Sequence, residues 1–257
     1  MRNLLTIVIL LSIFGSFSCK SNIKTKQFLK DSCKILQTDS KFLSPKTAIE
    51  NLTAAYDSLG RIVSRKSAGK DLFSYSYAKD EIIEKYEFED KGKQLITFHH
   101  KLDDQGRIIS SYNSDLRTDY SYDKEGYLAI KKSSYSNSSD YEKITKYTIT
   151  GGELQRKEDT GEAYLSLDTV IFSSGTDTFP NNFYCLIDHL PYELTGELRH
   201  YYGKPLKKLP IKSAIHGMAP VYYAYKKDSK GNVIQVNMLV KYKKEEMGLI
   251  NITYSCN

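Results

Sequence analysis

The sequence predicts an all-β protein: an antiparallel meander of hairpins that forms a curved sheet or partial barrel, with one short helix-and-loop insertion. Two observations predict this fold. Apolar and polar residues alternate with a period of two, and short turns containing Asp and Gly recur between the alternating segments. The 21 tyrosines, against 10 phenylalanines and no tryptophan, suit a sheet with one face in water. One all-β domain can fill a chain of 257 residues.

The composition excludes several classes of protein. Hydrophobic residues make up 40% and charged residues 26%, which are ordinary globular values and exclude a wholly disordered chain. The 37 basic and 31 acidic side chains give a net charge of +6, and the two signs are interspersed along the sequence. A nucleic-acid-binding protein would concentrate its basic residues in a patch, so we expect no nucleic-acid partner.

The first residues predict a targeting segment. A short positive start at Arg2 precedes an apolar run from Leu4 to Phe14, which only Thr6 and Ser12 interrupt. A membrane-spanning helix needs about 20 apolar residues, so this run is too short to span and fits the apolar region of a signal peptide. We therefore expect a signal peptide at residues 1–18.

The segment Ser16-Phe17-Ser18-Cys19 resembles the lipobox of bacterial lipoproteins. The resemblance implies cleavage before Cys19 and a lipid on its thiolate, with residues 19–30 as a tether. A plain secretory signal with an incidental cysteine is the alternative. Lys20 follows the cysteine in place of the Asp that favours inner-membrane retention in many lipoproteins. We therefore expect an outer-membrane protein facing the periplasm, with cell-surface display as the alternative.

Period-two alternation then recurs along the chain. After a short strand around residues 33–36, one face is formed by Phe73, Tyr75 and Tyr77, and another by Ile82, Tyr86 and Phe88. Further faces group Leu116 with Tyr120 and Tyr122, Ile234 with Val236, Met238, Val240 and Tyr242, and Ile250 with Ile252 and Tyr254. This pattern is typical of antiparallel strands that bury one face.

A turn motif repeats between these strands. Tyr56-Asp57-Ser58-Leu59-Gly60-Arg61-Ile62 has related copies beginning at residues 102, 122 and 227. Each reads as strand, Asp-x-x-Gly turn and strand. Asp can accept a hydrogen bond from the backbone two residues on, and Gly supplies a positive φ. We expect hairpin turns at Gly60, Gly106, Gly126 and Gly231.

This motif resembles the tyrosine–aspartate (YD, or Rhs-like) repeat, whose hairpins stack into β-sheets. A wider resemblance covers residues 30–257 and points to an uncharacterised family of Gram-negative lipoproteins. It rests on the lipobox, on the hairpins at 56–63 and 222–236, on the segment at 201–210 and on the final strand at 250–256. The resemblance implies a large, curved, porin-like β-meander and assigns no activity.

Residues 174–220 interrupt the meander and contain five of the six prolines. Phe183, Leu186, Ile187 and Leu190 have helical spacing, so we expect a short helix at 181–190 that Pro191 ends. We interpret the segment as a helix-and-loop insertion that plugs one end of the sheet. Residues 31–257 then form a single β-meander domain.

The sequence predicts neither a catalytic nor a metal site. It contains no Gly-x-Ser-x-Gly elbow, glycine-rich phosphate loop or His-Glu-x-x-His pair. His99 and His100 are adjacent on an expected strand, so they point to opposite faces and cannot share a metal ion. We expect no enzyme activity and no cofactor.

Lipidation of Cys19 would leave three cysteines, Cys33, Cys185 and Cys256, and hence three pairings. Cys185 falls in the expected helix, where a thiol can pack as a small apolar group. Cys33 lies in the first strand-like segment and Cys256 in the last. If the meander curls so that its ends meet, these strands become neighbours. We therefore hypothesise a Cys33–Cys256 disulfide, which the oxidising periplasm would preserve.

Two functions fit these features. The first is a non-catalytic interaction or scaffold module, held at the membrane by its N-terminal lipid. The second is a carrier or sensor of an apolar ligand in a half-barrel cavity. The partner, whether protein, glycan or apolar ligand, is open. The tyrosines fit either a plain sheet face or a binding surface.

Overall fold

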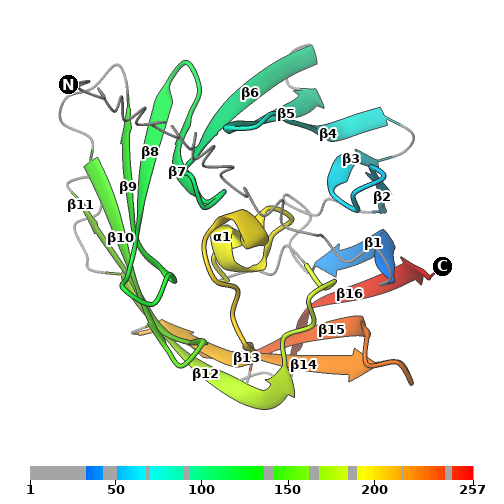
Figure 1. The fold of residues 1–257 in the computed structure, drawn as a ribbon. Coiled ribbons are helices and arrows are strands. Elements are labelled where there is room, and N and C mark those ends of the chain that lie inside the picture. Colours follow the sequence, from blue (N-terminus) through cyan, green and yellow to red (C-terminus); the bar gives the residue numbers. More distant parts are fainter. Residues whose placement is uncertain are drawn as a thin grey trace, which may run out of the picture.

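A computed structural model describes residues 33–42, 51–67, 70–89, 93–135, 142–161, 168–184, 190–215, 217–240 and 245–256. Sixteen antiparallel strands form one sheet, which closes into a barrel around a short helix (Figure 1). The prediction of an antiparallel all-β fold is confirmed. The expected curved sheet or partial barrel is corrected to a closed barrel, because β1 pairs with both β2 and β16.

The strands follow one another around the barrel in chain order. The first eight are β1 (Lys34–Phe42), β2 (Leu52–Tyr56), β3 (Ile62–Ser67), β4 (Lys70–Tyr77), β5 (Glu81–Glu89), β6 (Lys93–Leu102), β7 (Ile108–Tyr112) and β8 (Leu116–Tyr122). The second eight are β9 (Leu128–Tyr135), β10 (Glu142–Thr150), β11 (Glu153–Gly161), β12 (Asp168–Thr178), β13 (Lys208–Ile215), β14 (Val221–Lys227), β15 (Val233–Val240) and β16 (Glu245–Ser255). At the seam between β1 and β16, Lys34 pairs with Ser255 and Phe42 with Gly248.

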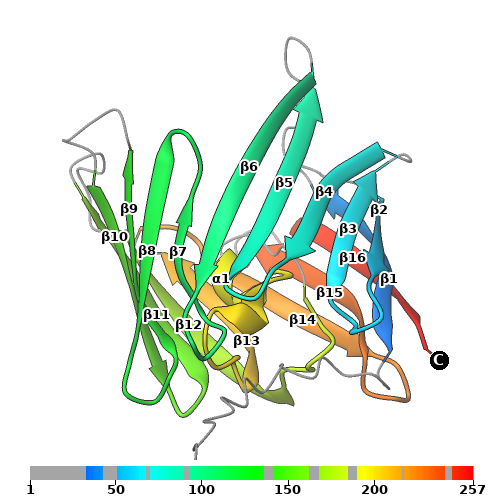
Figure 2. The same cartoon turned by 45° about the horizontal axis from the view of Figure 1, so that its top comes forward.

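The four Asp-x-x-Gly motifs form hairpin turns of one design. In the first, the Gly60 N–H donates to the Asp57 carbonyl at 3.0 Å, and the Asp57 carboxylate accepts from the N–H groups of Leu59 and Arg61. The four glycines all have positive φ, at 80° (Gly60), 70° (Gly106), 89° (Gly126) and 84° (Gly231). These turns lie at one end of the barrel, the turn end, at the bottom of Figure 2.

After each of these turns the strand pairing shifts by one residue. This shift determines which apolar residue points into the core. The pairing skips Val63, Ile109, Ala129 and Ile234, which places Ile62, Ile108, Leu128 and Val233 in the core. Ile234 therefore leaves the face that the sequence assigned to it with Val236 and Met238. Val233 takes the buried position instead and is 0% exposed.

Tyrosines join one hairpin to the next. The hydroxyl of Tyr56 donates to the carbonyl of Ile35 at 2.8 Å, that of Tyr77 to Ile62 at 2.7 Å and that of Tyr254 to Val233 at 3.0 Å. Tyr122 and Tyr225 bond the carbonyls of Ile108 and Pro210 in the same way. A tyrosine can fill the apolar core with its ring and still satisfy a carbonyl at its tip, which accounts for the high tyrosine content.

The insertion between β12 and β13 occupies the interior of the barrel, where α1 (Tyr192–Thr195) lies inside the ring of strands in Figure 1. It spans 179–207, shorter than the expected 174–220, because β12 continues to Thr178 and β13 begins at Lys208. It is attached to the turn end of the barrel, where the N–H groups of Lys204 and Lys207 donate to the backbone carbonyls of Gly126 and Gly152.

The expected helix at 181–190 is wrong for the part that the structure describes. Residues 181–184 form a turn and extended chain, and residues 185–189 lie outside the described ranges. Pro191 precedes the helix rather than ending one. Proline suits this position because the N–H groups at the start of a helix have no partner within the helix, and proline has no N–H. A 3₁₀ turn, η1 (Arg199–Tyr201), follows α1.

Many outward side chains of β8–β11 are charged. Thr118, Ser133 and Thr145 point inward and are buried, so their sequence neighbours and the residues in line with those neighbours point outward. Ile130 and Ile144 are apolar members of this outward face, and we call its charged members the outer charged face: Arg117, Asp119, Lys132, Glu142, Lys146, Arg156 and Glu158. Ion pairs link Arg117 to Asp119 at 2.8 Å and Lys132 to Glu142 at 2.7 Å, and a third joins Arg156 to Glu158.

Candidate functional site

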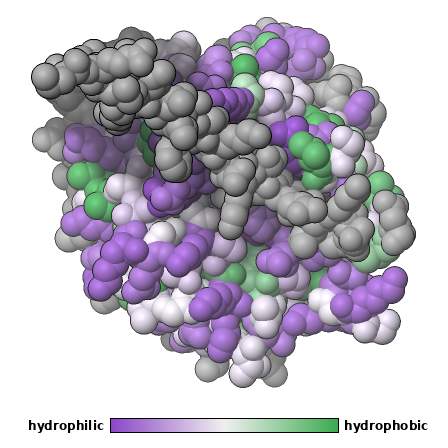
Figure 3. Space-filling view, in the orientation of Figure 1, coloured by the Kyte–Doolittle hydropathy of each residue, from purple (hydrophilic) through white to green (hydrophobic). Residues whose placement is uncertain are grey.

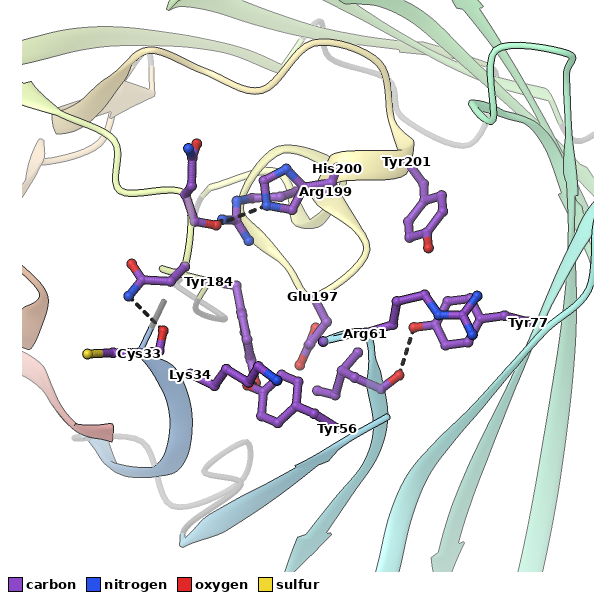
Figure 4. Close-up of a pocket in the computed structure, with 14 residues that line it drawn as sticks. Cys33, Lys34, Tyr56, Arg61, Tyr77, Tyr184, Glu197, Arg199, His200 and Tyr201 are labelled. Carbon is purple, nitrogen blue, oxygen red and sulfur yellow. Dashed lines mark hydrogen bonds between the residues drawn. The ribbon is translucent and has the colours of Figure 1, made fainter. Parts of the chain in front are cut away.

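A pocket opens at the turn end between the insertion and strands β1–β4, with a cavity of about 80 Å³ (Figure 4). Its lining combines the starts of β1 and β3, the ends of β2 and β4, and two stretches of the insertion, 181–184 and 197–201. The polar and aromatic members are Lys34, Tyr56, Arg61, Tyr77, Asn181, Asn182, Tyr184, Glu197, Arg199, His200 and Tyr201. The pocket exists because the barrel closes and brings β1 beside the insertion.

Tyrosines form the walls of the pocket. Tyr56 and Tyr184 place their hydroxyl oxygens 2.8 Å apart, and the rings of Tyr77 and Tyr201 stack with centroids 6.0 Å apart. Burial raises the pKa of Tyr56 and of Tyr77 far above the usual phenol range. These phenols therefore stay neutral at physiological pH.

Two of the charged lining residues already have partners. Glu197 forms an ion pair with Arg65 of β3, and both side chains are almost fully buried. Arg61 pairs with Asp57 at 2.7 Å and lies over the Tyr77 ring, 4.3 Å from its centroid. The net charge of these two pairs is zero.

Arg199 differs from those pairs. Arg199 is 3% exposed, and its Nη2 donates to the backbone carbonyls of Pro180 and Asn181. Its buried Nε–H has no hydrogen-bond partner. No carboxylate of the described residues lies within ion-pair distance of it. Burial lowers the pKa of this guanidinium to about 9, which still leaves it charged at neutral pH.

A second ion pair fixes the insertion to the opposite wall. Glu193 of α1 accepts from Lys131 of β9 at 2.5 Å and from the hydroxyl of Tyr147 on β10 at 3.3 Å. Burial acts to raise the pKa of the Glu193 carboxyl, but the Lys131 charge and these hydrogen bonds outweigh it and hold the pKa below its usual value. The charged carboxylate therefore stabilises the seated insertion.

This carboxylate predicts a loss of stability in acid. A carboxyl whose pKa is lower in the folded state contributes stability that is present above its unfolded pKa, about 4.3, and is lost as pH falls through the folded value. Urea midpoints between pH 7 and pH 3 should therefore fall less steeply below pH 5 for Glu193→Gln than for the wild type. At pH 7 the variant should be less stable by about 1–3 kcal/mol.

Glu142→Gln is the matched control for that series, because Glu142 pairs with Lys132 on the exposed outer face. Exposed pairs contribute about 0–1 kcal/mol, so this variant should follow the wild-type pH curve. Identical slopes for Glu193→Gln and the wild type would contradict a stabilising Glu193 carboxylate.

The site residues expected from sequence fall in three places. Cys19, the expected lipid attachment site, and Cys185 lie outside the described residues. Cys33 and Cys256 are joined by a disulfide with a Cα–Cα distance of 4.1 Å, beside the pocket. Of the turn glycines, Gly60 lines the pocket, whereas Gly106, Gly126 and Gly231 belong to other hairpins.

The two adjacent histidines point to opposite faces, as expected. His100 points into the barrel, where it bonds Ser111 at 2.7 Å and Glu84 at 3.1 Å, and His99 bonds Glu81 at 3.1 Å. Within the described ranges, no three His, Cys, Asp or Glu side chains gather as a metal site would require. Among the same residues, no helix has the length and apolar character needed to cross a membrane.

Sequence reasoning missed Arg65, Glu197 and Arg199. They come from segments more than 130 residues apart, and only the seated insertion brings them together. One signal was available. Glu197 and Arg199 flank Leu198 in a segment that continues with Tyr201 and Tyr202, and a charge in an apolar segment marks a buried ionic group.

Comparisons with known proteins support the fold. No protein-family model matches the chain, and no curated protein does. Two crystal structures described as porin-like proteins are similar. One, from Bacteroides uniformis, has a TM-score of 0.58 at 14% identity, and the match covers 86% of this chain and 98% of the chain in that structure. The other, from Bacteroides vulgatus, has a TM-score of 0.59 at 17% identity, and the match covers 86% of this chain and 99% of the chain in that structure. At these identities the likeness shows a shared porin-like barrel fold.

Proposed function

We propose that this chain is a lipid-anchored outer-membrane protein whose barrel stands in water, facing the periplasm, as a non-catalytic interaction module. In this proposal the lipid on Cys19 provides the attachment and the barrel provides the binding surface. The lipobox-like segment at 16–19 supports the anchor, and the Cys33–Cys256 disulfide suits an oxidising compartment.

The outer charged face carries the proposal. A barrel that spans a bilayer turns an apolar band outward and keeps polar residues inside. Here Lys132, Lys146 and Arg156 point outward from the middle of β9, β10 and β11. An Arg or Lys at the bilayer midplane costs about 2–4 kcal/mol, so three would cost roughly 6–12 kcal/mol. Figure 3 shows hydrophilic side chains, with hydrophobic ones scattered among them, over the coloured part of one end of the barrel.

The interior supports the same proposal. The lumen of a porin is polar and filled with water. In this barrel the insertion places Leu194, Leu198, Tyr202 and Leu206 in the core, each 3% exposed or less. The turn end is therefore filled by packed side chains, which suits a stable binding scaffold better than a channel.

Three ionisable groups of the pocket favour binding over catalysis. A general acid or base needs a pKa near the working pH and freedom to exchange protons. Glu197 is held by Arg65, and the pKa values of Tyr56 and Tyr77 are raised far above neutrality. These groups are suited to holding a ligand.

The proposal predicts that Cys19→Ala releases a folded barrel into water. In a Gram-negative host the variant should move from the membrane fraction to the soluble periplasmic extract. It should remain soluble without detergent and keep the far-ultraviolet circular dichroism of a β protein. Globomycin should cause the wild-type precursor to accumulate. A Cys19→Ala protein that stays in the membrane and resists alkaline carbonate would contradict the proposal.

One observation favours the carrier function as a second candidate. Phe73, Tyr86 and Phe88 form a stacked row on the inner faces of β4 and β5, with centroids 4.8 and 5.2 Å apart, and all three are only half-buried. An exposed aromatic row inside a barrel could contact an apolar ligand. Native purification followed by lipid mass spectrometry tests this, and a stoichiometric lipid that Phe88→Ser abolishes would favour the carrier.

A further inference from the structure

We propose that the turn-end pocket binds a small oxyanion, the carboxylate or phosphate group of a sugar-sized molecule, at Arg199. The inference deepens the proposed binding function by naming the chemistry of the ligand. It rests on three features of the pocket: an uncompensated buried cation, neutralised neighbours, and a small cavity with tyrosine walls.

The first feature is the unsatisfied guanidinium. A buried charge is costly unless an opposite charge and hydrogen bonds compensate it, and buried N–H groups in native proteins nearly always have partners. Arg199 has two backbone carbonyls on Nη2, but its Nε–H has no partner. A guanidinium is a planar fork of donors that matches the two oxygens of a carboxylate or phosphate. An oxyanion in the pocket would supply the opposite charge that this buried guanidinium lacks.

The second feature is the charge balance around Arg199. Glu197 is the one carboxylate among the described lining residues, and Arg65 neutralises it. Asp57 neutralises Arg61 in the same way. Lys34 adds a positive charge at the wall, with Nζ 5.5 Å from the centroid of the Tyr56 ring. The remaining field is positive, so a neutral or cationic ligand would not compensate it.

The third feature is the size of the pocket. A cavity of about 80 Å³ has room for several water molecules or one compact group such as a carboxylate or phosphate, so the rest of a ligand would lie at the open mouth of the pocket. The rings of Tyr56, Tyr184 and Tyr201 give it aromatic walls with polar tips, which suit the faces and hydroxyl groups of a sugar. These walls point to a sugar acid or sugar phosphate as the ligand.

Calorimetric titration of the full chain in detergent tests the inference with three probes that share one ring. Glucose is neutral, glucuronate carries a carboxylate and glucose 6-phosphate carries a phosphate. At least one of the two anions should bind about tenfold or more tightly than glucose, because a hydrogen bond to a charged group is stronger than a neutral one. The tighter anion identifies which oxyanion the pocket accepts.

Variants then locate the binding. Arg199→Gln should reduce the affinity of the preferred anion to that of glucose, and Lys34→Gln should reduce it about threefold. Arg117→Gln removes an arginine from the outer face and should leave binding unchanged. Near-ultraviolet circular dichroism checks that each variant is folded. If Arg199→Gln does not fold, the inference is tested by the loss of affinity in Lys34→Gln and by the difference between glucose and the two anions in the wild type.

Two results would overturn the inference: equal binding of glucose and both anions, including no binding at all, or a folded Arg199→Gln protein with wild-type affinity for the anion. The fractionation of Cys19→Ala does not involve the pocket. A soluble Cys19→Ala barrel that binds no anion would therefore overturn this inference alone. A barrel that stays in the membrane would overturn the proposed function alone.

Discussion

Removal of the Cys33–Cys256 disulfide is expected to lower the free energy of unfolding by about 3–5 kcal/mol. The bridge joins residues 223 apart and so closes nearly the whole described chain into one loop. In the chain-entropy model a loop of this length stabilises by about 5 kcal/mol as an upper figure, through restriction of the unfolded chain. Urea unfolding of Cys33→Ser/Cys256→Ser, compared with the wild type, measures the difference.

A reductant provides the control for this prediction. It should lower the urea midpoint of the wild type to that of the double variant and leave the double variant unchanged. The eight register pairs between β1 and β16 do not need the bridge, so the reduced protein should keep its β-type circular dichroism. A wild-type midpoint that reductant does not move, or peptide mapping that finds Cys185 paired, would contradict the assignment.

Breaking the buried Arg65–Glu197 ion pair is expected to have the second largest effect. The pair joins β3 to the insertion, and Arg65 Nη2 also donates to the hydroxyl of Thr38 on β1 at 3.3 Å. Loss of one partner leaves the other charge buried without compensation. Arg65→Met and Glu197→Leu should therefore each destabilise the protein by about 3–5 kcal/mol, measured by urea unfolding.

The double variant separates this mechanism from simple loss of packing. Arg65→Met/Glu197→Leu removes both charges, so it should be less destabilised than the sum of the single variants, and nearly neutral if the two apolar side chains pack together. Additive effects in the cycle would show that the two side chains stabilise the barrel independently.

Local features of the fold could be predicted from the sequence because their physical causes are local. Asp57 and Gly60 form their turn through hydrogen bonds within four residues, and the same holds for the copy at Asp103 and Gly106. Alternation placed Tyr75 and Ile82 on the buried face for the same reason.

Closure and the path of the insertion depend on contacts that no local pattern contains. The meeting of β1 with β16 decides between a partial and a closed barrel, and it pairs residues at opposite ends of the chain. Pro191 illustrates the second difficulty, since proline is compatible both with the end of one helix and with the start of the next. The pocket was missed for the same reason, because Tyr56 and Arg199 become neighbours only after closure.

The central claim is that the strands of this barrel face water while the protein is attached to the membrane. A spin label on Lys132→Cys, in a Cys185→Ser background, tests it most directly in membranes that carry the protein. Lys132 lies in the middle of β9 on the outer charged face, and its side chain is 51% exposed. The label should collide more often with a water-soluble nickel complex than with oxygen dissolved in lipid. A label that is shielded from nickel and relaxed by oxygen would place this strand in the bilayer and contradict the claim.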